Sequence, residues 1–201
     1  MILRVYKILN LTKVEGPGTR FCIWTQGCLK RCKGCYAKDT WDLKGGILYE
    51  IDEIIDMILS VKEKIEGITF LGGEPFIQAE ALYYISKKAK DMNLSVVCFS
   101  GMKYDEILKS KNLFYEKLLS CVDLLIDGEF VEEKLDYKRP WVGSENQNYI
   151  FLTDRYSMND ILKCKNKIEI HFEKNGRLFL NGMGDFNKIL RQLSLKRVSK
   201  L

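Results

Sequence analysis

The sequence has 201 residues, 46% of them hydrophobic, which is enough for one substantial core and does not require a second domain. Its 32 basic and 27 acidic residues give a formal charge of +5, a mild excess that lacks the concentrated basic stripe of a nucleic-acid-binding protein. No run approaches the roughly 20 apolar residues of a membrane-spanning helix. Arg4 and Lys7 interrupt the first apolar stretch, so we expect a cytoplasmic protein without a signal peptide.

Strands and helices are predicted to alternate along the first 128 residues. Strands are predicted at 2–9 and 20–27, which are rich in β-branched and aromatic residues, with a Gly- and Pro-rich turn at 15–19 between them. Helical spacing and short apolar runs then predict a helix at 47–64, a strand at 67–73, a helix at 78–92, a strand at 94–101, a helix at 104–120 and a strand at 122–128. This alternation is typical of a parallel sheet with right-handed crossovers. The predicted fold is α/β, a layer or partial (β/α) barrel of about six parallel strands, in a single domain over 1–201.

The pattern changes beyond residue 128. A polar connection leads to a predicted strand near 149–153. Two alternating segments within 168–182 flank Asn175 and Gly176, a pair that favours a type I′ turn, so a β-hairpin is predicted there. A short helix at 186–196 is predicted to close the chain.

The unusual residues of the sequence follow the predicted strands. They stand in four loops: Cys28 to Cys35, Gly72 to Pro75, Ser100 with Gly101, and Asp127 with Gly128. Ligands bind at the carboxyl ends of parallel strands in folds of this kind. We therefore expect the four loops to converge on one site.

Three cysteines form the most specific motif in the chain. Cys28, Cys32 and Cys35 follow a C-x3-C-x2-C pattern in one loop, and seven cysteines in a reducing compartment stay free unless they bind metal or do redox chemistry. Three thiolates can hold three corners of a [4Fe-4S] cluster and leave the fourth iron without a protein ligand. An iron without a protein ligand can bind a small molecule and take part in a reaction.

Two other metal centres are less favoured by the same pattern. A structural zinc site needs four ligands and usually presents two paired knuckles. The fourth ligand would have to be one of five residues, none of which is paired at knuckle spacing: Cys22, Cys98, Cys121, Cys164 or His171. A plain electron-transfer cluster is disfavoured because ferredoxin patterns supply four cysteines.

The segment QGCLKRCKGCYAKDTWD resembles the cluster loop of radical S-adenosylmethionine activating enzymes, in particular those that activate anaerobic ribonucleoside-triphosphate reductase. The resemblance covers about residues 16–186. It implies that Cys28, Cys32 and Cys35 ligate a [4Fe-4S] cluster whose open iron chelates the amino and carboxylate groups of S-adenosylmethionine. It also implies that Gly34 and Tyr36 flank the adenine. Lys33 departs from the family, which often has proline between the second and third cysteines.

Further site residues are expected after the later strands. Gly72 and Gly73 allow a close approach of the backbone to a ligand, and Glu74 adds a carboxylate. The resemblance identifies this turn as the one that binds the methionine end of the cofactor, with Glu74 as acceptor from its ammonium group. For Ser100 and Asp127 it implies contacts to the ribose, the methionine or a nearby cation, whereas the residues alone are equally consistent with local turn bonding.

A polar run near residue 144 has no role that the sequence defines. The run GEF…PWVGSENQ is similar to a further family segment, and it contains Ser144, Asn146 and Gln147. These side chains are expected either to order a cover over the cofactor or to satisfy the backbone of a long loop.

The resemblance implies a reaction and two protein partners. A flavodoxin-like or ferredoxin-like donor would reduce the cluster, S-adenosylmethionine would be cleaved to a 5′-deoxyadenosyl radical, and this radical would take the α-hydrogen of one glycine in a glycyl-radical enzyme, such as anaerobic ribonucleotide reductase. The alternatives are a radical enzyme that modifies a peptide or small molecule and a non-catalytic metal-binding module. Only Cys164 follows residue 121, so the auxiliary-cluster domain of larger peptide maturases is not expected.

Overall fold

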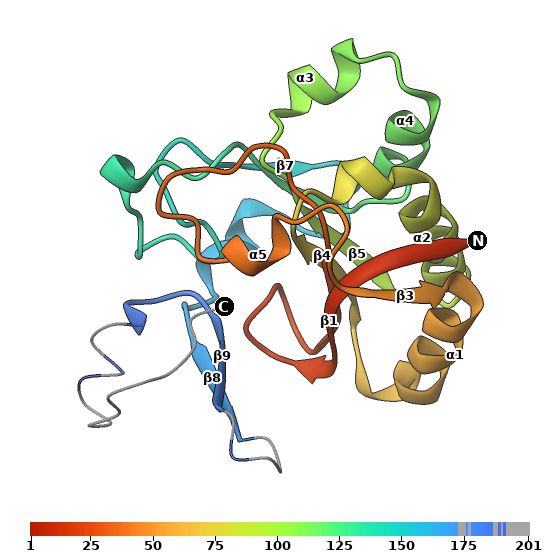
Figure 1. Ribbon diagram of the computed structural model, residues 1–201, viewed down its shortest axis with the longest axis horizontal. Helices are drawn as coiled ribbons and strands as arrows, with labels where there is room; N and C mark the ends of the chain where they lie inside the picture. The colour runs from red at the N-terminus through yellow and green to blue at the C-terminus, as the bar shows by residue number, and fades with distance from the viewer. Residues whose placement is uncertain (173–175, 177, 187–188, 190, 192–201) are drawn as a thin grey trace.

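The computed structural model describes residues 1–172, 176, 178–186, 189 and 191, and its centre is a seven-stranded sheet (Figure 1). In spatial order the strands are β3 (Ile47–Glu50), β1 (Ile2–Thr12), β2 (Arg20–Thr25), β4 (Gly67–Gly72), β5 (Ser95–Phe99), β6 (Leu124–Asp127) and β7 (Asn148–Phe151). The α-helices are α1 (Ile51–Val61), α2 (Ala79–Asp91), α3 (Tyr104–Lys109), α4 (Leu113–Leu119) and α5 (Met158–Leu162). Short 3-10 turns lie at Lys38–Thr40, Lys62–Lys64, Pro75–Gln78 and Glu132–Lys134.

The sheet is mixed, which corrects the expectation of about six parallel strands. Only β2, β4, β5 and β6 run parallel to one another, whereas β1 pairs antiparallel with both β2 and β3, and β7 pairs antiparallel with β6. A short turn joins β1 to β2, and such a turn can only produce an antiparallel pair. The connection from β6 to β7 contains no α-helix to carry the chain back for a parallel return.

Helices α1 to α4 cover one face of the sheet. Residues 21 and 23 of β2 point into the main core with Ile54 and Ile58 of α1 and Leu82 of α2. The intervening residues of β2 point to the opposite face, where a second apolar group begins. Because both faces are covered, the parallel strands are almost continuously apolar.

The opposite face is covered by α5 and by a separate two-stranded hairpin (Figure 1). The hairpin consists of β8 (Ile168–Phe172) and β9 (Leu178–Gly182), which pair antiparallel as predicted, while Asn175 in its turn lies outside the described residues. Phe179 of β9 meets Trp24 of β2 edge to face, with ring centroids 6.2 Å apart. Of the helix predicted at 186–196, most residues also lie outside the described part of the chain.

Two other predicted elements differ from those observed, and one observed helix was not predicted. Residues 47–50 form β3 instead of the start of a helix, the helix predicted at 104–120 is two helices, α3 and α4, and α5 was not predicted. Lys111 lies between α3 and α4 with a φ of 52°, which ends the first helix. The side chain of Asn112 then accepts hydrogen bonds from the backbone N–H groups of Phe114 and Tyr115 and begins the second.

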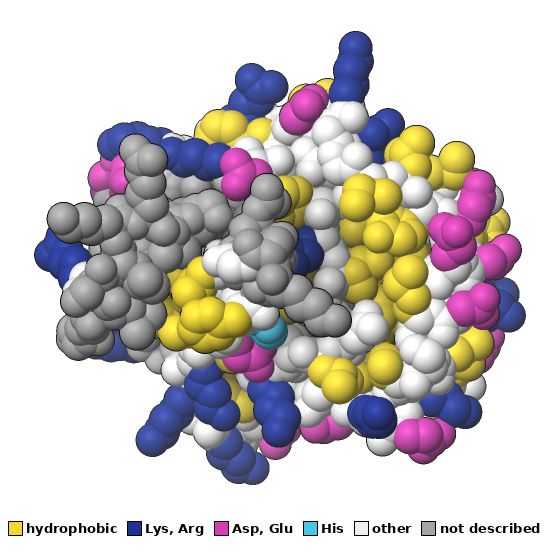
Figure 2. Space-filling view, turned by 60° about the horizontal axis from the view of Figure 1, so that its bottom comes forward, with side chains coloured by type: hydrophobic (Ala, Val, Ile, Leu, Met, Phe, Trp, Pro, Cys, Tyr) yellow, Lys and Arg dark blue, Asp and Glu magenta, His cyan; other side chains and the backbone are white. Residues whose placement is uncertain are grey.

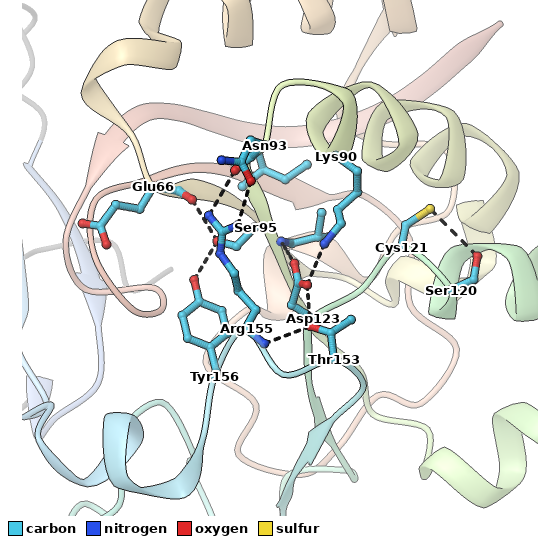
Figure 3. A network of polar contacts seen from close by, with 12 residues as sticks. Glu66, Lys90, Asn93, Ser95, Ser120, Cys121, Asp123, Thr153, Arg155 and Tyr156 are labelled. Atoms are coloured by element: carbon cyan, nitrogen blue, oxygen red, sulfur yellow. Dashed lines mark hydrogen bonds and ion pairs between the residues drawn. The ribbon is translucent and has the colours of Figure 1, made fainter.

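The amino-terminal edge of the parallel strands is closed by buried polar contacts (Figure 3). Asp123 accepts hydrogen bonds from Lys90 Nζ at 2.6 Å, Thr153 Oγ1 at 2.7 Å and the backbone N–H of Val96 at 2.8 Å. Beside it, the fully buried guanidinium of Arg20 donates to Ser95 Oγ at 2.7 Å. These hydrogen bonds hold the amino-terminal edge of the strands together. It lies opposite to the edge that carries the cysteines.

No described helix combines the length and the apolar character needed to cross a membrane.

Candidate active site

The cysteine loop leaves the carboxyl end of β2 and is held at both ends by the backbone. Gly27 N donates to Thr40 O at 2.7 Å, and Cys28 N donates to Trp41 O at 3.3 Å. Cys28, Cys32 and Cys35 are partly exposed and line a single cleft of about 140 Å³. The structure thus brings the three predicted thiols to one place.

Backbone hydrogen-bond donors reach two of the three thiols and oppose the effect of burial on their pKa. Burial raises the pKa of the Cys28 thiol, and hydrogen bonds from the backbone N–H groups of Arg31 and Lys30 oppose this effect. Burial likewise raises the pKa of Cys32, against a hydrogen bond from the backbone of Phe130. Backbone donors aimed at sulfur stabilise its negative charge. Among the described residues, no group of three His, Cys, Asp or Glu side chains is placed so that it could hold a single metal ion.

Two further cysteines lie in strands and do not line this cleft. Cys22 and Cys98 are fully buried in β2 and β5, and burial raises the pKa of both thiols well above its ordinary value. Neither lines the cleft. They behave as small apolar core residues.

The glycine turn after β4 lies directly against the exit of β2. Gly73 N donates to Thr25 O at 2.8 Å, and Glu74 N donates to Gly27 O at 2.8 Å. A Cβ on Gly73 would lie 2.3 Å from Gly27 O, and Gly72 has a φ of 98° that favours glycine. The two glycines are needed so that this turn can contact the start of the cysteine loop.

Glu74 presents a buried carboxylate at the wall of the cleft. It is 3% exposed, and it accepts hydrogen bonds from Ser100 Oγ at 2.9 Å and from the backbone N–H groups of Phe76 at 3.1 Å and Gly101 at 2.8 Å. Burial raises its pKa, and these three donors and the charge of Lys30 oppose the rise. Hydrogen bonds from neutral donors stabilise the charged form of a carboxylate, which is the form that attracts a cationic group of a ligand.

Ser100 lines the cleft, whereas Asp127 does not. Ser100 lines the cleft and fixes Glu74 through the hydrogen bond above. Asp127 lies at the same edge of the sheet but does not line the cleft, and its oxygens accept hydrogen bonds from Tyr104 N at 2.7 Å and Asn148 Nδ2 at 3.0 Å. Its neighbour Gly128 does line the cleft. Asp127 therefore helps to hold the end of β6 in place without lining the cleft.

Gly34 and Tyr36 lie on the far side of the cysteine loop. Gly34 has a φ of 75°, and a Cβ there would lie 2.8 Å from the carboxyl group of Glu132. The hydroxyl of Tyr36 is 2.9 Å from that of Tyr137, and burial raises the pKa of Tyr36 well above its usual range. The ring of Tyr36 packs on Phe130 with centroids 5.6 Å apart.

The segment 129–147 lies against the cysteine loop and contributes two residues to the cleft. Phe130, whose role was not predicted, and Gln147, which was expected either to order a cover or to satisfy the loop, both line the cleft. Gln147 accepts hydrogen bonds from the backbone N–H groups of Gly143 at 2.7 Å and Ser144 at 3.2 Å, and donates to Gly128 O at 2.9 Å. Phe130 belongs to the GEF segment that resembles the family, but nothing in the sequence indicated its role.

Ser144 and Asn146 stabilise the same segment. The hydroxyl of Ser144 accepts a hydrogen bond from Val131 N at 3.2 Å, and Asn146 Nδ2 donates to Glu129 O at 2.8 Å. Both side chains bond backbone within 128–147. These contacts correspond to the second role expected for the polar run, which is to satisfy the backbone of a long loop.

Comparison with known proteins identifies the family of this chain. Residues 14–150 match the model of a family described as a 4Fe-4S single cluster domain. The anaerobic ribonucleoside-triphosphate reductase-activating proteins of Haemophilus influenzae and Enterobacteria phage T4 are each 32% identical to this chain, over 67% and 70% of its length and 88% and 89% of theirs. The pyruvate formate-lyase-activating enzyme of Clostridium pasteurianum is 33% identical over 55% of this chain and 50% of its own length.

The residues present fit the cofactors of these enzymes. Three thiols without a fourth cysteine in the cleft match a cluster with one open iron, and a buried carboxylate on the facing turn matches a ligand that carries an ammonium group. The protein belongs to the radical S-adenosylmethionine activating enzymes with a single [4Fe-4S] cluster, in the family of the anaerobic ribonucleoside-triphosphate reductase-activating proteins.

Proposed function

We propose that this chain activates a glycyl-radical enzyme, with anaerobic ribonucleotide reductase as its partner. Cys28, Cys32 and Cys35 would hold the [4Fe-4S] cluster. When bound, the cluster and S-adenosylmethionine supply reductive cleavage of the sulfonium bond and thereby the removal of a hydrogen atom from a glycine. One observation carries the proposal: the three thiols and the Gly72–Glu74 turn border the same cleft.

The protein's own groups bind and orient the cofactor in this proposal. Glu74 accepts a hydrogen bond from the ammonium group of S-adenosylmethionine, and Ser100 keeps the carboxylate in position. Gly72 and Gly73 give the ligand close access to backbone groups. Asp127 acts indirectly, since it ties the neighbouring strand end to Tyr104.

Two groups on the other side of the cysteine loop complete the site. Gly34 leaves space beside the third cysteine, and Tyr36 offers an aromatic face to the adenine. Phe130 and Gln147 line the cleft beside them. We also propose that residues 1–201 form a single radical S-adenosylmethionine domain with its core at about 16–186, and that the sheet is the partial barrel of this enzyme class.

The proposal is tested with anaerobically reconstituted protein. Iron and sulfide are counted per chain, and 5′-deoxyadenosine is measured after addition of S-adenosylmethionine and dithionite, with and without anaerobic ribonucleotide reductase. We expect about four irons per chain, formation of 5′-deoxyadenosine, and a glycyl radical signal on the reductase. A four-cysteine centre without response to S-adenosylmethionine would contradict the proposal. A flavodoxin or ferredoxin replaces dithionite in a second series, because we propose such a protein as the electron donor.

A further inference from the structure

A second pocket lies at the amino-terminal edge of the parallel strands, away from the cysteine cleft. Its volume is about 450 Å³, which is within the range of ordinary ligand pockets. The turn before β2, Glu66 before β4 and the segment 163–167 after α5 all contribute to its lining. The pocket shares no lining residue with the cleft. It is therefore separate from the candidate active site.

The lining of this pocket is strongly basic. It contains four exposed lysines, which are Lys13, Lys163, Lys165 and Lys167. Lys163 Nζ lies 3.5 Å from Asp160, whereas the other three lysines form no ion pair with any described residue. Three ammonium groups are thus available to a ligand.

The basic region is visible from the side of the β8–β9 hairpin. Figure 2 shows Lys and Arg side chains gathered below the single histidine, His171 of β8. Glu169 accepts a hydrogen bond from Lys13 N at 2.8 Å and lies 3.4 Å from His171 Nε2. Lys13 therefore belongs to this part of the surface.

Glu66 is the only carboxylate among the described residues that line the pocket. Its Oε1 accepts a hydrogen bond from Thr19 N at 3.2 Å. A Cβ on Gly18 would collide with this carboxyl group, and Gly18 has a φ of 70°, so that glycine is needed for the acid to lie against the turn. One acid held by the backbone does not neutralise four lysines, and the remaining positive charge attracts anions.

The segment that carries three of the lysines is fixed to a neighbouring loop by Asn166. Its Oδ1 accepts a hydrogen bond from Trp141 N at 3.0 Å, and its Nδ2 donates to the carbonyl groups of residues 137 and 139 at 3.0 and 2.9 Å. Trp141 has a φ of 60°, which is unusual for a bulky residue. Because Asn166 stands between Lys165 and Lys167, these bonds fix the backbone from which both lysines extend.

The charges and the walls of the pocket favour one class of ligand. A lysine ammonium group is a compact point charge that binds phosphate oxygens. Lysines on two separate segments suit a chain of phosphates better than a single one. Trp141 lines the pocket but is only 4% exposed, so its indole offers little surface on which a base could stack.

We propose that this pocket is a second ligand site that binds a polyphosphate group, either free or as the triphosphate of a nucleotide. Lys13, Lys165 and Lys167 are the residues that contact the phosphate oxygens. All four lysines lie outside residues 14–150, which is the part of the chain that matches the family. The inference does not depend on the proposed function, because it concerns the opposite edge of the sheet.

The test is calorimetric titration of the anaerobically reconstituted protein, without reductant and with saturating S-adenosylmethionine, so that the cofactor site is filled. The probes are sodium tripolyphosphate, ATP without magnesium, adenosine and sodium sulfate. We expect tripolyphosphate and ATP to bind, and adenosine and sulfate to bind far more weakly. Added sodium chloride should weaken the binding, since it screens charges at the surface. Cluster absorbance before and after each titration shows whether iron is retained.

The double variant Lys165→Gln/Lys167→Gln should bind tripolyphosphate about tenfold more weakly, the loss expected from two exposed charge pairs. The matched control is Lys88→Gln/Lys109→Gln. These two exposed lysines lie on α2 and α3, do not line the pocket, and give the same change in net charge. The control should bind like the wild type, and both double variants should keep the wild-type melting temperature.

The two phosphate probes distinguish the sources of the ligand. Equal affinities for tripolyphosphate and ATP would show that the phosphates alone are recognised, whereas tighter binding of ATP would identify a nucleotide, and both results support the site if the lysine pair is required. Equal weakening in the two double variants would overturn the inference, because the effect would then be one of net charge. Binding of an acidic protein such as a flavodoxin by these lysines, without binding of either phosphate probe, would also overturn it.

Discussion

Gly73→Ala tests whether the turn before Glu74 must touch the exit of β2. The added Cβ would lie 2.3 Å from Gly27 O and 2.9 Å from Thr25 O, and both are backbone atoms that cannot rotate away. The turn has to move, and with it the two hydrogen bonds of 2.8 Å that join it to these carbonyl groups. Overpacking and loss of these bonds should together cost about 2 to 4 kcal/mol of unfolding free energy.

The assay for this prediction is thermal unfolding of the metal-free protein under reducing conditions, followed by circular dichroism. For a chain of this size the expected loss lowers Tm by about 4 to 16 °C. Gly101→Ala is the matched control, because its Cβ would have its nearest neighbours at 3.4 Å, an ordinary contact. Iron content after anaerobic reconstitution should fall in Gly73→Ala, since the displaced turn borders the start of the cysteine loop. Equal Tm values for the two variants would refute the reasoning.

Three further predictions concern the cysteines, the base of the sheet and a buried acid. Cys35→Ala should lose most of the reconstituted iron, whereas Cys164→Ser should keep the wild-type amount, and iron loss in the latter would show that a ligand was misassigned. Arg20→Met should lower the free energy of unfolding in urea by about 3 kcal/mol, because it leaves several buried acceptors without their donor, and a loss below about 1 kcal/mol would contradict this. Burial raises the pKa of Glu15 to about 7 from 4.5, so its contribution to stability is present below pH 4.5 and is lost as the pH rises through 7. In Glu15→Gln, urea unfolding at pH 5 and pH 8 should show a pH dependence smaller than that of the wild type by about 2 to 3 kcal/mol, and parallel dependences would refute it.

The parallel centre of the fold was predictable because its signals are local. Each of β4, β5 and β6 is a short apolar run, and helical sequence precedes β5 and β6. The edges were not predictable in the same way. Ile47 and Leu48 have apolar spacing that also suits a helix, and they form a strand because β1 offers its free edge to them. The direction of β7 likewise depends on a long irregular connection.

The parts of the candidate site that directly follow a strand could be predicted from the sequence. The cysteine loop and the Gly72–Glu74 turn follow neighbouring parallel strands, and the sheet brings them together as expected. Phe130 and Gln147 could not be placed, since their position depends on how the segment 129–147 folds back. Asp127 has the residue type of a ligand, but its carboxylate is turned toward Tyr104 and Asn148.

Cys35 lines three neighbouring hollows of the protein. Besides the cleft, it lines a cavity of about 210 Å³ beside β9 and an outer pocket of about 450 Å³ that Tyr137 and Glu132 also line. Cys28 and Cys32 line only the cleft among these three spaces. A change of side chain at the third thiol should therefore alter all three spaces at once, whereas a change at either of the other two should alter one.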